Sequence, residues 1–320
     1  LNVNLNRMQS AYNTFEQALE YKEDWVSWSS LLKGSKGNRT SLNTGPRDVG
    51  KFLFENLFNK YGGGLICSAT LTVEFAFDYI KDQLGLDNLN IEKEVKEYIY
   101  QSPFHYEDQV KLFAWQGDAD VNSNAFIQKI GDQINEISSR IHRRMLVLCT
   151  SYKQTTALRD YLKPKMNQDD RQIFTQSMGK NRKSLLHGYL QHKRSILIGT
   201  SSFWEGVDLP GDKVEILILM KIPFANPGDP IIQSQIDHYK MQDRNPFMEF
   251  QVPDATVRLK QGFGRLIRTL EDSGICIIAD PRVTRSRYGK VILDSLPVQA
   301  QLYEQSSRII YEAESFFGNS

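Results

Sequence analysis

The chain has 320 residues, of which 40% are hydrophobic and 24% are charged, and its net charge is +1. Such a chain is long enough for about two ordinary domains and can bury a sizeable core. The near-neutral charge excludes a field over the whole molecule that would attract nucleic acid or membrane, so any basic surface is expected to be local. No apolar run approaches the roughly 18 residues of a membrane-spanning helix.

The cysteines and the N-terminal residues indicate the cellular compartment in which the protein is expected. Cys67, Cys149 and Cys276 lie far apart, each inside an apolar run, which predicts buried thiols in a reducing environment. Their spacing predicts no metal site. The sequence begins at Leu1 rather than Met, and no apolar signal segment follows. We therefore expect a cytoplasmic protein without membrane contact, and a fragment of a longer chain.

In chain order, the first predicted elements are a strand within residues 23–32 and a turn over 33–39. A helix is predicted from about Pro46, because "RDVGKFLFENLFNKY" repeats its apolar residues at helical spacing. Three glycines at 62–64 end this helix.

A different pattern follows, in which short apolar runs alternate with amphipathic stretches. The runs are bounded by polar residues and suit strands covered on both faces. The predicted strands are 65–69, 145–149, 196–199, 214–219 and 274–279, and the predicted helices are 125–142, 153–164, 182–192 and 254–270. This alternation predicts an α/β fold with a parallel sheet flanked by helices. A polar stretch at 85–105 places the expected boundary between domains 1–100 and 101–320.

Polar groups follow four of these strands, in residues 68–72, 150–154, 200–211 and 280–282. The carboxyl ends of parallel strands share one edge of a sheet, where ligands gather. Each polar group alone could be a helix cap. Four together favour a ligand-binding edge.

The predicted helix 254–270 carries its arginines on one side. At 100° per residue, Arg258, Gln261, Arg265 and Arg268 share a face opposite the apolar residues. No acidic residue lies between positions 254 and 271, and the planar fork of a guanidinium suits phosphate. The pattern therefore predicts an arginine pair that grips a phosphate group.

A nucleotide site would also need a phosphate loop. The nearest match to that motif is "GPRDVGKF" at 45–52, which ends in Phe52 instead of a hydroxyl residue that could hold Mg²⁺. No apolar strand ends in Asp-Glu. The sequence thus shows the arginines without a recognisable cradle or metal site.

Four segments together resemble the C-terminal half of a superfamily-two DNA helicase of the DinG/XPD type. "SATLT" at 68–72 resembles motif III and "TSY" at 150–152 resembles motif IV. "GTSSFWEGVDLPG" at 199–211 resembles motif V, and "QGFGRLIR" at 261–268 resembles motif VI. The resemblance covers about residues 45–300. Motifs I and II and the four-cysteine iron–sulfur segment of the family do not occur.

The resemblance implies that residues 1–100 are the tail of a first RecA-like domain and that 101–320 are the second. Arg265 and Arg268 would then be arginine fingers on the γ-phosphate of ATP, with Gln261 on the same surface. ATP and Mg²⁺ would be held mainly by an upstream domain of the same polypeptide. The positions that match residues of ATP contact and coupling are Ser68, Thr70, Glu205, Gly206 and Asp208.

The same resemblance implies contacts with single-stranded DNA by Ser151, Tyr152 and Thr200. A block from Arg171 to Trp204 adds basic residues and no acid, which predicts a groove that tracks phosphates. Its six basic residues are Arg171, Lys180, Arg182, Lys183, Lys193 and Arg194. We expect Arg182 and Lys183 to contact DNA.

Three alternatives stay open from the sequence. The chain could belong to a non-catalytic nucleic-acid-binding module derived from a helicase. It could belong to a bifunctional exonuclease and helicase. It could also be an unrelated nucleotide-binding enzyme that uses residues 45–52.

Overall fold

The computed structural model divides the chain into two compact units. The first comprises residues 1–72, 76–98 and 224–254, and the second comprises 73–75, 99–223 and 255–320. The structure describes residues 2–20, 24–34, 37–87, 94–166, 170–176, 182–200 and 214–318. None of the helices within these ranges is long and apolar enough to cross a membrane.

The first unit contains a two-stranded antiparallel hairpin and several helices. Strand β1 (Trp25–Gly34) pairs with β2 (Gly37–Pro46), from Trp25 opposite Pro46 to Gly34 opposite Gly37. The strand expected within 23–32 is therefore present, but most of the turn expected at 33–39 is strand. The helical elements of this unit are α1 (Asn2–Leu19), α2 (Val49–Asn56), η1 (Phe58–Lys60), α3 (Asp78–Leu84), α9 (Pro230–Met241) and η2 (Phe247–Gln251).

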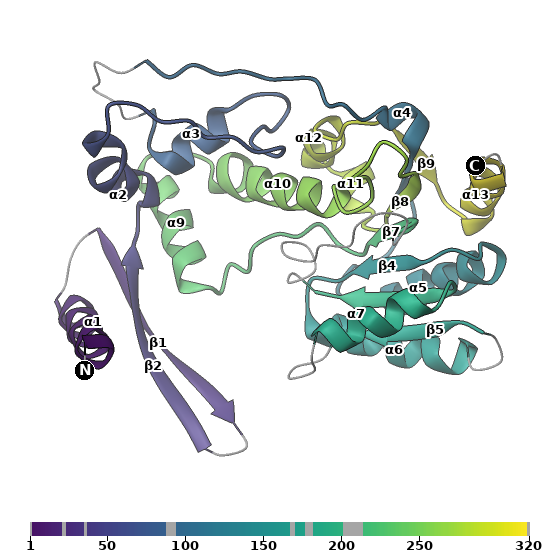
Figure 1. Ribbon diagram of the computed structural model, residues 1–320, viewed down its shortest axis with the longest axis horizontal. Helices are drawn as coiled ribbons and strands as arrows, with labels where there is room; N and C mark the ends of the chain where they lie inside the picture. The colour runs from purple at the N-terminus through teal and green to yellow at the C-terminus, as the bar shows by residue number, and fades with distance from the viewer. Residues whose placement is uncertain are drawn as a thin grey trace. The chain divides into compact units, whose positions relative to one another are not determined.

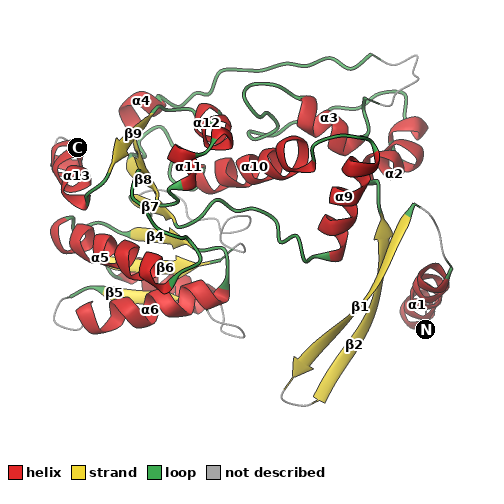
Figure 2. Cartoon of the chain, turned by 180° about the vertical axis from the view of Figure 1, so that it is seen from behind, coloured by secondary structure: helices red, strands yellow, loops and turns green. Residues whose placement is uncertain are grey.

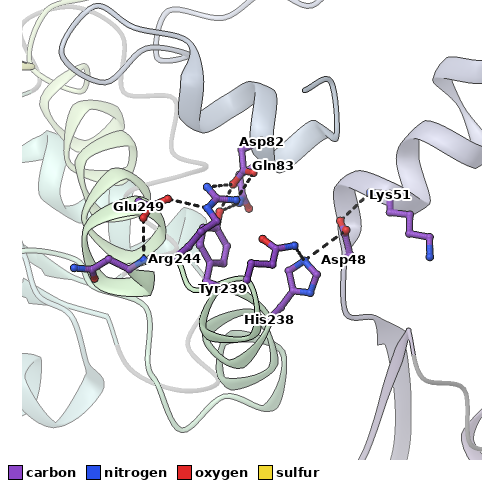
Figure 3. A network of polar contacts seen from close by, with 10 residues as sticks. Asp48, Lys51, Asp82, Gln83, His238, Tyr239, Arg244 and Glu249 are labelled. Carbon is purple, nitrogen blue, oxygen red and sulfur yellow. Dashed lines mark hydrogen bonds and ion pairs between the residues drawn. The ribbon is translucent and has the colours of Figure 1, made fainter. Parts of the chain in front are cut away.

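A polar network joins three of these elements (Figure 3). Arg244 forms two hydrogen bonds to Asp82 on α3, at 2.8 and 3.2 Å, and a third to Glu249 on η2 at 2.7 Å. Tyr239 on α9 donates its hydroxyl hydrogen to Asp82 and accepts one from Gln83 at 3.0 Å. Burial and the bond to Asp82 raise the pKa of Tyr239. The network therefore fixes residues 239–249, which are distant in sequence, to α3.

The strand expected at 65–69 is absent, and this prediction was wrong. Residues 63–68 adopt no regular structure, and the side chain of Leu65 is 89% exposed. Cys67 is also exposed, whereas Cys149 and Cys276 are buried as predicted, and burial raises the pKa of both thiols. An apolar run becomes a strand only beside a partner, and this run pairs with no strand among the described residues.

The second unit is built on a seven-stranded parallel sheet, which confirms the predicted α/β class. The strand order is β5-β6-β4-β7-β8-β3-β9, and every neighbouring pair is parallel. The strands are β3 (Val110–Trp115), β4 (Met145–Leu148), β5 (Gln172–Thr175), β6 (Ser195–Gly199), β7 (Ile216–Leu219), β8 (Gly274–Ile278) and β9 (Ala300–Tyr303). The central strands β4, β6, β7 and β8 are buried along their whole length.

Helices cover both faces of this sheet. Figures 1 and 2 show α5 (Asn124–Arg140) and α6 (Tyr152–Met166) on one face and α7 (Arg182–Gln191) on the other. Alternate strand residues such as Val147, Ile198 and Ile218 pack into one buried cluster with α5 and α6. The other helices of the unit are α4 (Tyr106–Gln109), α10 (Val252–Phe263, which begins in the first unit), α11 (Arg282–Arg285), α12 (Arg287–Asp294) and α13 (Ser306–Gly318).

Candidate functional site: the carboxyl edge of the sheet and an arginine loop

The polar residues predicted after β4 and β6 do meet at one edge of the sheet. The two strands are parallel neighbours, so their carboxyl ends lie side by side. After β4, Ser151 accepts a hydrogen bond from the backbone N–H of Gln154 at 3.2 Å, which caps the first turn of α6. Ser151 and Tyr152 are exposed there, whereas Thr200 after β6 is buried.

Gln176, which the sequence analysis did not single out, links these positions. Its Oε1 accepts hydrogen bonds from the backbone N–H of Thr200 at 2.8 Å and from the Thr200 hydroxyl at 2.9 Å. Its Nε2 donates to the Tyr152 hydroxyl at 3.1 Å. One carboxamide after β5 therefore fixes the end of β6 relative to the start of α6.

Charged residues continue the edge beyond β7 and β8. The carboxylate of Asp280 is completely buried and accepts three hydrogen bonds from the Arg282 guanidinium, at 2.6, 2.9 and 3.2 Å. It also accepts the backbone N–H groups of Ile222 at 2.9 Å and Arg282 at 3.0 Å. The bond to Asp280 raises the pKa of Arg282. The bond from the Ile222 N–H to Asp280 connects the segments that follow β7 and β8.

The arginine segment differs from its prediction. Helix α10 ends at Phe263, so Arg265 and Arg268 lie in a loop and not on the helical face with Arg258 and Gln261. Gly264 directly follows the last helical residue, and the N–H of Arg265 bonds to the Gly262 carbonyl at 3.0 Å in a turn. The helix expected over 254–270 was therefore wrong beyond residue 263, because Asp272 and Gln109 bind the backbone of residues 268–272 in place of helical hydrogen bonds.

The loop is nevertheless well held. Asp272 accepts the backbone N–H groups of Arg268 at 2.7 Å and of Thr269 at 2.8 Å. Gln109 donates to the carbonyl groups of Thr269, Leu270 and Asp272 at 2.8–3.3 Å. The side chains of Leu266 and Ile267 are buried. The backbone of Arg265 and Arg268 is therefore held in place, and their side chains are partly exposed.

The segment 45–52 is unsuited to hold a phosphate. It connects an antiparallel hairpin to α2, and the Asp48 side chain caps that helix by accepting the N–H of Lys51 at 2.8 Å. The Lys51 ammonium pairs with Asp24 at 2.7 Å. A phosphate at this helix end would meet a carboxylate in place of free N–H groups. This geometry argues against the unrelated nucleotide-binding enzyme.

The segments at the carboxyl edge of the sheet and the arginine loop lie within a region that matches a known protein family. Residues 134–299, more than half of the chain, match the family model of the helicase C-terminal domain. This chain belongs to that family. The match includes the ends of β4 to β8 and the arginine loop.

Three curated relatives support this membership. The chain is 33% identical to ATP-dependent DNA helicase YoaA of Haemophilus influenzae over 82% of this chain and 39% of the relative. It is 31% identical to ATP-dependent DNA helicase DinG of Photobacterium profundum, over 95% and 44%. It is 29% identical to 3'-5' exonuclease DinG of Bacillus subtilis, over 86% and 30%. The resemblance to DinG-type helicases is confirmed, and the chain spans less than half the length of each relative.

The positions predicted to contact ATP or couple its hydrolysis do not all lie near the arginine loop in the described structure. Glu205, Gly206 and Asp208 lie outside the described residues. Ser68 and Thr70 lie in the first unit, where the Thr70 N–H donates to Ser68 Oγ at 3.3 Å in a local turn. They therefore belong to a different unit from the arginine loop.

The predicted basic block is divided between two edges of the sheet. Helix α7 begins after the carboxyl end of β5 and returns to the amino end of β6, so Arg182 and Lys183 start at the ligand edge. Lys193 and Arg194 directly precede β6 and lie at the opposite edge. Arg171 is buried and donates to Asn135 and Ser138 at 2.7–3.0 Å. One continuous groove over all six residues is therefore wrong, because Arg171 has a structural role and Lys193 and Arg194 lie at the other edge. Lys180 lies outside the described residues.

Proposed function

We propose that this chain is the C-terminal part of an ATP-dependent DNA helicase that supplies arginine fingers and one wall of a DNA-tracking surface. The observation that carries the proposal is the fixed loop of Arg265 and Arg268 in a member of the helicase C-terminal domain family. Relatives named ATP-dependent DNA helicases support the same reaction for the whole protein.

The catalytic part of this proposal is charge stabilisation by the loop. ATP with Mg²⁺ would supply the phosphoryl group that is transferred to water. The residues that fit it here are Arg265 and Arg268, whose side chains are partly exposed, and Gln261 on the last turn of α10. Two planar forks of N–H donors would hold the oxygens of the transferring group, and a finger arginine contributes about 10³–10⁵ in rate.

The DNA-binding part of the proposal uses the carboxyl edge. Ser151 offers a hydroxyl and Tyr152 an exposed ring beside it, and Gln176 holds Tyr152 in place through its hydroxyl. Aromatic rings stack on bases, and hydroxyl groups bond to phosphates, without sequence preference. The buried Thr200 would support this edge through Gln176.

The first unit supports an upstream partner domain. The apolar run Leu65–Ile66–Cys67 is exposed just before the helicase motif at 68–72. Exposed apolar surface of this kind favours a contact that covers it. We assign the run to the surface of an incomplete first RecA-like domain, which an upstream part of the polypeptide would cover.

We expect the 320-residue chain alone not to hydrolyse ATP. Residues 45–52 do not form a phosphate-binding loop, so Arg265 and Arg268 would have to bind ATP in a site exposed to water. Each ion pair with a phosphate contributes little binding free energy there. The expected ATP dissociation constant is about millimolar or weaker. A millimolar constant corresponds to a binding free energy of about −4 kcal/mol. Calorimetry and phosphate release with and without DNA provide the measurement, and micromolar, Mg²⁺-dependent binding with turnover would contradict the proposal.

We expect replacement of both Arg182 and Lys183 with alanine to weaken single-stranded DNA binding equally on unrelated sequences. The slope of log K against log salt should fall by about 0.7 for each DNA phosphate that the variant no longer neutralises. The matched control is Lys193→Ala, since Lys193 is exposed at the amino edge of the sheet. An unchanged slope in the double variant would assign Arg182 and Lys183 to the solvated surface.

Two measurements on the whole protein separate the other candidates. DNA-stimulated ATP turnover distinguishes a helicase from a non-catalytic DNA-binding module. One relative carries exonuclease in its name, which favours the bifunctional enzyme as a second candidate. Shortening of a 5'-labelled strand by the whole protein without ATP tests that activity.

A further inference from the structure

Lys221 is a lysine on the carboxyl edge that neither the sequence motifs nor the proposed function uses. It lies two residues after the end of β7, and the N–H of the intervening Met220 bonds to the Leu148 carbonyl of β4 at 3.0 Å. Strand β7 is the neighbour of β4 in the sheet. Lys221 therefore lies one strand away from the segment of Ser151 and Tyr152.

The ammonium group of Lys221 is only partly satisfied by the protein. It donates a hydrogen bond to Asn122 Oδ1 at 3.0 Å, and among the described residues it forms no ion pair. An ammonium has three N–H donors, so donors remain for a ligand. The side chain is half-buried, which limits the positions that it can reach.

The charged side chains that act on this ammonium are one guanidinium and two carboxylates. Burial lowers the pKa of Lys221, and the neighbouring Arg282 lowers it further, while Asp280 and Asp120 act in the opposite direction. The Asp280 carboxylate already accepts five hydrogen bonds, three from the Arg282 guanidinium and two from backbone N–H groups. An anion near Lys221 Nζ would offset the effects of both burial and Arg282.

We infer that Lys221 binds a backbone phosphate of the single-stranded DNA that crosses the carboxyl edge of this sheet. The inference rests on the proposed function. Three neighbouring strands, β6, β4 and β7, span about 10 Å at their carboxyl ends. The edge offers hydroxyl and aromatic groups at β4 and a cation at β7. A DNA strand that passes from Tyr152 to Lys221 would thus stack a base on the Tyr152 ring and then place a phosphate beside the Lys221 ammonium.

The test measures binding of labelled oligo-dT to the whole protein by fluorescence anisotropy between about 50 and 200 mM salt. We expect Lys221→Ala to lower the log–log salt slope by about 0.7 and to weaken binding about fivefold at 0.1 M salt. Lys221→Arg should keep the slope, because it keeps the charge. Asn122→Ala removes the hydrogen bond but not the charge, and it should also keep the slope.

Controls separate this inference from the proposed function. Lys193→Ala removes an exposed lysine from the opposite edge and should leave both affinity and slope unchanged. If Lys221→Ala matches wild type in slope and affinity while wild-type protein binds DNA and hydrolyses ATP, only this inference is overturned. If wild-type protein binds no single-stranded DNA, the proposed function itself is overturned. Equal decreases of slope in Lys221→Ala and Asn122→Ala, with lowered melting temperatures, would show a structural role and also overturn the inference.

Discussion

Replacing Arg265 or Arg268 with alanine in the whole protein is expected to lower kcat for DNA-stimulated ATP hydrolysis by about 10³–10⁵. This factor corresponds to about 4–7 kcal/mol of transition-state stabilisation. The physical reason is that both arginines leave a loop held by Asp272 and Gln109, so their forks of donors need little reorganisation. The measurement is steady-state phosphate release at saturating ATP and single-stranded DNA.

Lysine variants and a distant arginine provide the controls. Arg265→Lys keeps the charge but loses the planar fork, so we expect an intermediate loss. Arg287→Ala removes an exposed arginine on α12 and should leave kcat unchanged. The free energy of unfolding should change little in all these variants, because the loop is held through its backbone. A loss below tenfold for both alanine variants would remove the finger assignment.

The central strands could be predicted because parallel strands covered on both faces appear in the sequence as continuous apolar runs. Strands β4, β6, β7 and β8 follow this rule. The strands that the sequence analysis missed include β5 and β9, which are the edges of the sheet and contain half-exposed residues. Their apolar density is therefore too low to stand out from amphipathic helices or loops.

The end of α10 could not be predicted from periodicity. Leu266 and Ile267 continue the apolar spacing of Leu259 and Phe263, and all four side chains are buried. The last two are buried from a loop, because Gln109, far away in sequence, satisfies the carbonyl groups beyond them. Local spacing records that a residue is buried but not which long-range contact replaces the helix.

The ligand edge was predicted in outline but not in its connections. Strand order brings the segments after β4 and β6 together, as the parallel sheet required. The bonds of Gln176 to Tyr152 and Thr200 have no local signal, since Gln176 follows the short strand β5. The segment 280–282 was predicted only as polar. The signal for its internal ion pair is an Asp at the end of an apolar run with an Arg two residues later.

The second large effect is expected at that pair: Asp280→Ala should lower the free energy of unfolding by about 2–4 kcal/mol. The substitution removes the acceptor of three guanidinium bonds and of the Ile222 and Arg282 N–H groups. We place the loss below that of a fully buried pair, because the Arg282 side chain is 37% exposed and can still reach water. Urea denaturation of the purified protein measures the change.

The matched control for Asp280 is Asp118, whose carboxylate pairs with Arg285 at 2.5 Å. The Asp118 side chain is 86% exposed, so Asp118→Ala should change the free energy of unfolding by less than about 1 kcal/mol. Both variants remove a carboxylate from an Asp–Arg pair, but Asp280 is buried and also accepts two backbone N–H groups, whereas Asp118 is exposed. Equal effects would show that the burial and the backbone bonds of Asp280 contribute nothing. The expected difference would instead identify the buried Asp280 carboxylate, which accepts the Ile222 N–H, as the link between the segments that follow β7 and β8, beside Lys221.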